Sequence, residues 1–357
     1  MTSLTIYAGP KALAKISQEG LHSDQFDTLV GASGGPKWFV LHGLDRYLFS
    51  EFFADVQSPI STIGSSAGAW RMCCLATADP VAAIDRLAQR YSEEKYSDKP
   101  TVEEITQKAR LMVEHVLGPT GAKEIVENNR FKTHVFADRC RGLSSAAGKP
   151  AQSLMLGSAA VANLVSRKTL SWFFERTVFT NGEPTYPVAW TDMRTKAVSL
   201  TEDNVVQAMM ATGSIPFVLD AVKDIPGASS GLYWDGGITD YHFDFPFNNG
   251  ERLVLYPHFS STVIPGWFDK KIPWRRVHSS NFDNVVLITP SEEFTAGLPY
   301  GKIPDREDFN RLNYEDRVNY WQTVLEESRR LADDFASLVG SKERCLEVLR
   351  PFSERAR

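Results

Sequence analysis

The chain has 357 residues, of which 43% are hydrophobic and 23% charged, and its formal net charge is -5. This length suits one large domain or two smaller ones, and the composition is that of a soluble globular protein. The acidic balance offers no general attraction for nucleic acid, which requires clustered lysine and arginine, so we predict no nucleic-acid partner. The sequence contains no run of about 18 apolar residues, so it predicts no membrane-spanning helix.

The first residues of the chain and the cysteines are used to predict the cellular compartment. The first residues, MTSLTIYAGPKALAKI, lack the basic start and apolar run of a secretory signal. Cys73, Cys74, Cys140 and Cys345 show neither the spacing of a disulfide framework nor that of a zinc site. We therefore expect free thiols and a cytoplasmic protein.

Short apolar runs alternate with amphipathic stretches over the first hundred residues. This pattern predicts three strands, at 4–7, 28–30 and 61–63. It also predicts helices at 10–18, from Pro36 to Leu48, and after Ser66. Strands that alternate with helices favour a parallel sheet with helices on its faces.

The middle of the chain, 79–130, is predicted to be helical. Asp79 and Pro80 suit a helix start, and Thr101 with Glu104 forms a capping box before apolar residues at helical spacing. Farther along, the pattern predicts a strand, a loop and a pair of strands, at 133–137, 141–151 and 186–200 respectively. The last third predicts strands at 253–256 and 284–288 and one long helix at 314–339, ended by Gly340.

A serine follows the third predicted strand within a turn motif. Gly64-Ser65-Ser66-Ala67-Gly68 matches G-x-S-x-G, in which small residues beside the serine allow a sharp turn between a strand and a helix. The hydroxyl is then held at a helix N-terminus, where the helix dipole favours developing negative charge. Ser66 is therefore a candidate nucleophile.

A second match to the same pattern lies earlier, at Gly31-Ala32-Ser33-Gly34-Gly35. Its glycines favour backbone N–H groups presented to an anion, as in an oxyanion hole. The spacing is neither that of a P-loop nor that of a dinucleotide-binding turn. A tight strand-to-helix turn without a ligand is the simpler alternative.

A third segment, Asp235-Gly236-Gly237, suits a tight turn when taken alone. The three segments together resemble the patatin-like phospholipases, in which a glycine-rich oxyanion loop, a G-x-S-x-G elbow and an Asp-Gly-Gly with the catalytic aspartate follow in this order. The matching segments are 33–37, 64–68 and 235–237, and AMMATGSIPF at 208–217 is similar to the family's segment before Asp-Gly-Gly. The resemblance covers about residues 25–250.

The resemblance implies a fold as well as an order of motifs. We expect a three-layer α/β fold with a central, mostly parallel sheet between helices, and with helical insertions. Residues 1–357 are expected to form a single domain, with the catalytic segments within 25–250 and a C-terminal extension, 251–357, that packs on the core.

The chemistry implied by the resemblance is hydrolysis of acyl esters of phospholipids, lysophospholipids or similar compounds by a Ser66–Asp235 dyad. Asp235 would take the proton of Ser66, which attacks the carbonyl and forms an acyl-enzyme. Gly34, Gly35 and Ala67 would hold the oxyanion. No metal or other cofactor is implied, and the oligomeric state stays open.

The sequence departs from the family pattern within the oxyanion loop. Ser33 stands at the first position of the family's triple glycine, and Lys37 stands where arginine is usual. Lysine keeps the positive charge but lacks the planar fork that binds an anion through two hydrogen bonds. We retain Lys37 as a substrate-binding candidate.

Three alternatives remain open at this stage. An acyltransferase would pass the same acyl group to an alcohol instead of water. A Ser-His-Asp hydrolase would combine Ser66 with a downstream aspartate and histidine, and the candidates are Asp220, Asp224, His258 and His278. A lipid-binding module without catalysis would result from a lost oxyanion hole.

The segment IPGWFDKKIPWRRVH, 264–278, joins aromatic and basic residues. Such a combination favours peripheral contact with an anionic lipid surface. A solvated loop with its two tryptophans turned inward is the alternative. Contact with a membrane predicts that changes at Trp267 and Arg275 weaken action on vesicles but not on soluble esters.

Overall fold

The computed structural model describes residues 2–141, 149–181 and 190–352. Within that part of the chain, eleven strands form one sheet. In chain order they are β1 (Leu4–Ala8), β2 (Phe26–Gly31), β3 (Ile60–Ser65), β4 (Phe131–Cys140), β5 (Phe174–Thr180), β6 (Thr195–Ser199), β7 (Val222–Lys223), β8 (Leu232–Asp235), β9 (Leu253–Pro257), β10 (Val285–Pro290) and β11 (Leu349–Pro351).

Helices surround this sheet. In chain order they are α1 (Pro10–Glu19), α2 (His42–Tyr47), α3 (Ala67–Leu75), α4 (Pro80–Ser92), α5 (Val102–Leu117), α6 (Gly121–Glu127), α7 (Lys149–Val165), α8 (Val205–Gly213), α9 (Glu292–Gly297), α10 (Asp308–Arg311), α11 (Tyr314–Glu327), α12 (Arg329–Leu338) and α13 (Lys342–Val348).

The centre of the sheet is parallel. The strand order is β11-β1-β10-β9-β2-β3-β4-β5-β6, and β8 pairs with both β4 and β7. The neighbours β10–β9, β9–β2, β2–β3 and β3–β4 are parallel, whereas β1–β10, β4–β5, β4–β8 and β7–β8 are antiparallel. The predicted α/β fold with a mostly parallel central sheet is thus confirmed.

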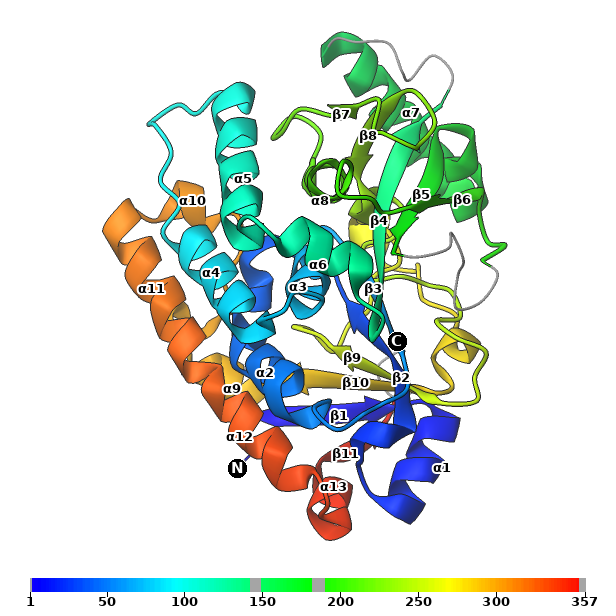
Figure 1. Cartoon of the computed structure of the whole chain (residues 1–357), viewed down its shortest axis with the longest axis vertical. Coiled ribbons are helices and arrows are strands. Elements are labelled where there is room, and N and C mark those ends of the chain that lie inside the picture. Colours follow the sequence, from blue (N-terminus) through cyan, green and yellow to red (C-terminus); the bar gives the residue numbers. More distant parts are fainter. Residues whose placement is uncertain (1, 142–148, 182–189, 353–357) are drawn as a thin grey trace.

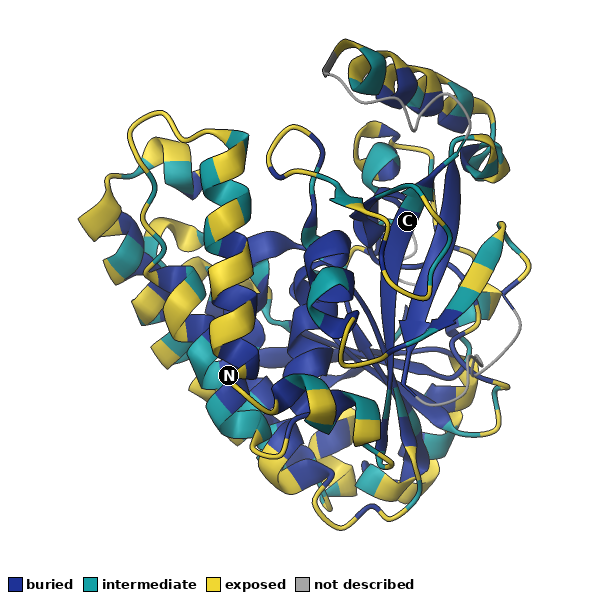
Figure 2. Ribbon diagram, turned by 45° about the horizontal axis from the view of Figure 1, so that its top comes forward, coloured by how far each residue is buried: buried dark blue, intermediate teal, exposed yellow. Residues whose placement is uncertain are grey.

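The helices cover the strands with their apolar faces. Helix α3 packs against β2, β3 and β4, α8 packs against β4 and β8, and α12 packs against α2 and β1. Figure 1 shows α4, α5 and α11 grouped at the left and α7 at the upper right. In Figure 2 the strands of the centre are mostly dark blue, as expected for parallel strands buried on both faces.

The predicted long helix at 314–339 is wrong in one respect, because it is two helices that meet at Ser328. The Ser328 hydroxyl donates to the Leu325 carbonyl and accepts the N–H of Gly43 at the start of α2. A Cβ atom on Gly43 would lie 2.5 Å from the Ser328 carbonyl oxygen. Serine that hydrogen-bonds back within its own helix bends it, and α2 docks at this bend.

Other predictions are corrected more locally. The helix expected from Pro36 begins as a 3-10 helix, Gly35–Leu41, before α2. In the expected loop at 141–151, residues 142–148 lie outside the described residues, and α7 begins at Lys149. In the expected strand pair at 186–200, β6 is present and the first strand falls mostly on 182–189, outside the described residues. None of the helices in the described ranges is long and apolar enough to span a bilayer.

Candidate active site

Ser66 occupies a strained turn between β3 and α3. Its φ is +53° and its ψ is -132°, a region that non-glycine residues rarely adopt. The flanking glycines allow this turn, because a Cβ on Gly64 would lie 2.6 Å from the Ala69 Cα and one on Gly68 would lie 2.0 Å from the Gly31 oxygen. The turn therefore requires the two glycines of the motif, and it also presses the elbow against β2.

The hydroxyl of Ser66 has a carboxylate partner. Its Oγ donates to Asp235 Oδ2 over 2.8 Å, and both side chains are buried. The Ser66 N–H donates to the Thr212 hydroxyl over 2.8 Å, and this hydroxyl donates to the Phe136 carbonyl. Helix α8, which carries Thr212, thus fixes the nucleophile turn from the side opposite β2.

Asp235 ends β8 and is positioned by its own backbone. Its N–H donates to the Ser214 carbonyl over 2.8 Å, and its Oδ1 accepts the Gly237 N–H over 2.7 Å. Gly236 leaves no room for a side chain, since a Cβ there would lie 2.2 Å from the Phe136 oxygen. Burial raises the pKa of Asp235, and the positive charge of Arg306, together with the hydrogen bonds from Gly237 and Ser66, opposes that rise.

The glycine-rich loop after β2 lies beside the elbow. Strands β2 and β3 pair Gly31 with Gly64, which brings both G-x-S-x-G motifs to the same edge of the sheet. The hydroxyls of Ser33 and Ser65 are 2.6 Å apart, and Ser65 donates to the Asp240 carbonyl. At the position where the family pattern has a glycine, Ser33 thus forms a buried hydrogen bond that joins the loop to the elbow.

Only some of the predicted oxyanion and substrate-binding residues line a cavity beside Ser66. Gly35 and Ala67 line a cavity together with Ser66. Gly34 packs against the Phe259 ring, since a Cβ on it would lie 2.5 Å from that ring. The Lys37 ammonium lies 5.5 Å from the centroid of the same ring, and Lys37 lines neither of the two cavities that Ser66 lines.

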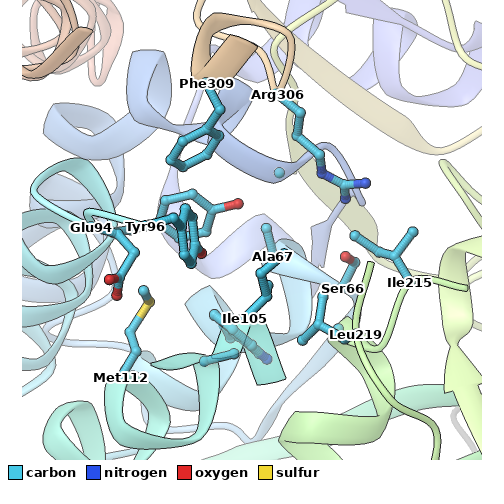
Figure 3. Close-up of a pocket in the computed structure, with 15 residues that line it drawn as sticks. Ser66, Ala67, Glu94, Tyr96, Ile105, Met112, Ile215, Leu219, Arg306 and Phe309 are labelled. Carbon is cyan, nitrogen blue, oxygen red and sulfur yellow. The ribbon is translucent and has the colours of Figure 1, made fainter. Parts of the chain in front are cut away.

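Two cavities meet at the nucleophile, and Ser66, Ile215 and Arg306 line both. The first is walled mainly by apolar and aromatic side chains (Figure 3), among them Trp70, Tyr91, Tyr96, Ile105, Ala109, Met112, Leu219 and Phe309. The second contains Asp235, Tyr241, Trp267 and Lys270. Because α4 and α5 supply much of the first wall, the helical region between β3 and β4 builds part of the site.

A comparison with known families agrees with this geometry. The family described as patatin-like phospholipase matches residues 55–248, just over half of the chain, and this range includes Ser66 and Asp235. The chain belongs to the patatin-like phospholipase family. No curated protein and no solved structure matches the chain.

Membership in this family of lipid acyl hydrolases leaves two side chains beside Ser66 unexplained. Arg306 and Lys270 lie outside the matched range and belong to none of the predicted catalytic motifs. Lys270 falls in the segment 264–278, for which the sequence predicted contact with a lipid surface. No local pattern marks Arg306, whose place at the site arises only from the folding of the C-terminal region onto the glycine-rich loop.

The histidines of the alternative triad lie elsewhere. His258 is buried, its Nδ1 accepts the Ser260 N–H, and burial lowers its pKa to about 3. His278 is exposed and pairs with Asp244 over 2.8 Å. Neither histidine lines the two cavities at Ser66. Among the residues that the structure describes, no cluster of three or more histidine, cysteine or acidic side chains is arranged to hold a metal ion.

Proposed function

We propose that this patatin-like protein is a serine esterase that hydrolyses acyl esters of phospholipids, lysophospholipids or related lipids through Ser66 and Asp235. The observation that carries the proposal is the 2.8 Å hydrogen bond from Ser66 Oγ to Asp235 Oδ2, at a turn with positive φ on the wall of an apolar cavity. A nucleophile that is hydrogen-bonded to its base beside an apolar cavity is the arrangement expected for acyl transfer through the enzyme.

The proposed reaction has two halves. Asp235 accepts the Ser66 proton as Ser66 Oγ attacks the ester carbonyl, and the alcohol leaves with that proton, which yields the acyl-enzyme. Water then gives a proton to Asp235 and attacks the acyl carbon. Asp235 returns that proton to Ser66 Oγ as the acid leaves, which restores both residues. Backbone N–H groups of Gly34, Gly35 and Ala67 are the proposed oxyanion donors.

The raised pKa of Asp235 supports its role as a base. An ordinary aspartate, with a pKa of about 3.9, is a weak base at neutral pH. Burial moves the Asp235 pKa upward, toward the working pH, which improves its match to the serine hydroxyl. The apolar wall on the α5 side offers the acyl chain a place removed from water.

The dyad is tested by turnover of a chromogenic acyl ester. We expect Ser66→Ala and Asp235→Asn to abolish turnover, and His258→Ala to retain it, with exposed His278→Ala as the control for a histidine change. A loss at His258 as large as that at Ser66 would instead support the triad. Absence of turnover by the wild type and every variant, on esters of several lengths, would favour the lipid-binding module.

We also propose peripheral contact with lipid surfaces through 264–278. Trp274 is 68% exposed and shares a groove with Leu164 and Val165, which are 49% and 86% exposed at the end of α7. Arg276 lines the same groove and is exposed. Apolar and aromatic side chains rimmed by cations suit the boundary of an anionic bilayer.

The structure changes which variants test this contact. Trp267 lines the active-site cavity and Arg275 pairs with Asp269, so both have roles within the fold. Exposed Trp274→Ala and Arg276→Gln are the cleaner choices. We expect each to weaken binding to vesicles that contain phosphatidylserine, with turnover of a soluble short-chain ester unchanged. Equal vesicle binding by wild type and both variants would contradict the contact.

A further inference from the structure

Two cationic side chains approach the nucleophile from the C-terminal region. Arg306 precedes α10, and Lys270 lies in the last turn of the 3-10 helix Trp267–Lys271; both line the cavity that holds Ser66 and Asp235. Figure 3 shows the Arg306 side chain reaching from its loop toward Ser66 and Ile215. The elements that carry these cations are separate in sequence from the catalytic motifs, so the motifs do not require them.

The position of Arg306 depends on a glycine of the oxyanion loop. Gly35 has a φ of +56°, and a Cβ on it would lie 2.9 Å from Arg306 Nε and 3.3 Å from its Cγ. The absence of a side chain at Gly35 therefore opens the space in which the guanidinium lies. The arginine rests directly on the backbone that is proposed to hold the oxyanion.

The charges of the two cations are only partly balanced within the described residues, because neither forms a salt bridge there and Asp235 is the one carboxylate that lines the same cavity. The carboxylates nearest to Arg306 in sequence serve other cations, since Asp305 and Asp308 pair with Lys302, and Glu307 pairs with Arg311. The carboxylate of Asp235 lines the cavity too, but it accepts hydrogen bonds from Ser66 and Gly237.

The surroundings of Lys270 show the consequence of this imbalance. Lys270 is exposed as a residue, but its ammonium lies 3.7 Å from the centroid of the Tyr241 ring, whose residue is buried. Burial of the ammonium and the positive charges of Arg306 and Lys37 lower the pKa of Lys270 to about 7. Cations that line one cavity are stabilised when an anion lies between them.

From this geometry we infer that Arg306 and Lys270 form a subsite for an anionic group, a phosphate or a carboxylate, carried by the alcohol portion of the ester. The inference rests on the proposed esterase function. The acyl chain occupies the apolar cavity and the carbonyl carbon lies at Ser66. The anionic group, a few atoms beyond the ester oxygen, meets the guanidinium, whose planar fork donates two parallel hydrogen bonds to such groups.

The test compares esters that share an acyl group and differ in charge. The values of kcat/KM are measured for 1-oleoyl-lysophosphatidate, for the oleoyl ester of lactate and for neutral 1-oleoylglycerol, all in micelles of one neutral detergent. We expect wild type to prefer an anionic ester, and the first two esters distinguish a phosphate from a carboxylate. Preference for the neutral ester would overturn the subsite.

The variants ask whether the two cations create that preference. We expect Arg306→Gln and Lys270→Gln each to reduce the ratio of anionic to neutral kcat/KM about 10-fold or more, mainly through KM, as a lost charge-assisted hydrogen bond does. The matched controls are Arg311→Gln for Arg306 and Lys271→Gln for Lys270, since both control residues are exposed and close in sequence to the residue they match. We expect the controls to keep the wild-type ratio of anionic to neutral kcat/KM. Equal losses for all esters would overturn the subsite and leave Arg306 with a role in catalysis alone.

Failure of the esterase function would be seen separately. If wild type hydrolyses none of the esters, binding to Ser66→Ala protein still tests the subsite. Binding is followed by the change in intrinsic tryptophan fluorescence, to which Trp70 and Trp267 in the cavity walls contribute. Tighter binding of lysophosphatidate or oleoyl lactate than of oleoylglycerol, lost in the Ser66→Ala/Arg306→Gln protein, supports it. Equal binding of charged and neutral lipids overturns it.

Discussion

The backbone N–H of Ser66 donates to the hydroxyl of Thr212 over 2.8 Å, and that hydroxyl donates in turn to the Phe136 carbonyl over 2.5 Å. One side chain on α8 therefore satisfies a donor on the nucleophile turn and an acceptor on β4. All three residues are buried, so water does not substitute for the hydroxyl at low cost.

We expect Thr212→Val, which has nearly the same shape, to lower stability and turnover together. Two buried polar groups lose their partner, which costs about 1–3 kcal/mol in the free energy of unfolding. The looser turn lowers kcat more than it raises KM, because Ser66 is misdirected and the cavity walls remain. Urea unfolding and steady-state kinetics measure both effects, and Thr212→Ser is expected to restore them. Wild-type kcat in Thr212→Val would contradict this positioning role.

The acid limb of the pH–rate profile should lie above the range of an ordinary aspartate. Asp235 must be ionised to accept a proton, and burial raises its pKa above the usual value of about 3.9. Activity on a neutral ester therefore rises with pH through that raised pKa. Because Arg306 lowers the Asp235 pKa, Arg306→Gln should move the limb to still higher pH. A limb at the same pH in both proteins would argue against this coupling.

The same raised pKa predicts a stability effect. Because the folded-state pKa of Asp235 lies above its unfolded value, the folded state binds the proton more tightly. Stability is therefore lost as pH rises through the two values. At neutral pH the buried carboxylate is a cost, and Asp235→Asn should raise the free energy of unfolding by about 1 kcal/mol while it abolishes turnover. Urea unfolding at pH 7 measures the change, and a loss of stability would contradict the prediction.

Preference for an anionic ester should fall as pH rises through about 7, where Lys270 loses its charge. The charged groups around this ammonium are Arg306, Lys37 and Asp235. Oleoyl lactate is the suitable substrate, since its carboxylate keeps one charge at all pH values above about 5, unlike a phosphate monoester. The ratio of its kcat/KM to that of oleoylglycerol gives the profile. A profile unchanged in Lys270→Gln would exclude Lys270 as its source.

A buried ion pair ties the nucleophile helix to its neighbour. Arg71 on α3 donates to both oxygens of Asp45 on α2 over 2.6 Å, and both side chains are fully buried. Arg71→Met leaves a buried carboxylate unpaired and should cost about 3–5 kcal/mol. Addition of Asp45→Leu removes the unpaired carboxylate and should recover most of the loss. The wild-type pair is itself incompletely satisfied, since Arg71 Nη1 has no partner among the described residues.

The control for this prediction is a surface pair. Arg46→Met removes one of the two partners of Asp85, which also bonds His42. The side chains of Arg46 and Asp85 are about 40% exposed, so the cost should stay below about 1 kcal/mol. Urea unfolding of the three variants gives the comparison. Equal losses for Arg71→Met and Arg46→Met would show that burial does not decide the energy of these pairs.

The sequence predicted the site as far as local chemistry requires particular residues. Gly64 and Gly68 are needed by a sharp turn, and Gly236 by contact with a carbonyl, so these motifs are visible without a structure. The segments they mark, including Ser66 and Asp235, meet in the fold, while the catalytic roles of these residues remain predictions. The single domain over 1–357 also remains a prediction, which the pairing of β11 with β1 favours.

What the sequence did not reveal depends on contacts between distant segments. Arg306 reaches the site because the C-terminal region folds against Gly35, and no spacing rule connects the two. The break at Ser328 depends on the approach of Gly43, whereas the helical spacing on its two sides is continuous. The position of Lys37 in the motif predicted a cation at the site, but the Lys37 ammonium lies over the ring of Phe259.

The order of strands in the sheet has a practical consequence for anyone who would trim this protein. The family match at 55–248 takes in β3 through β8 but omits β2, β9 and β10, and β2 is the neighbour of β3 at the sheet centre. A fragment with those limits would expose β3 as an apolar edge strand with unpaired backbone groups. Such an edge can pair with another copy of the fragment and lead to aggregation. The catalytic motifs alone are therefore too short a piece to express, and the flanking strands belong with them.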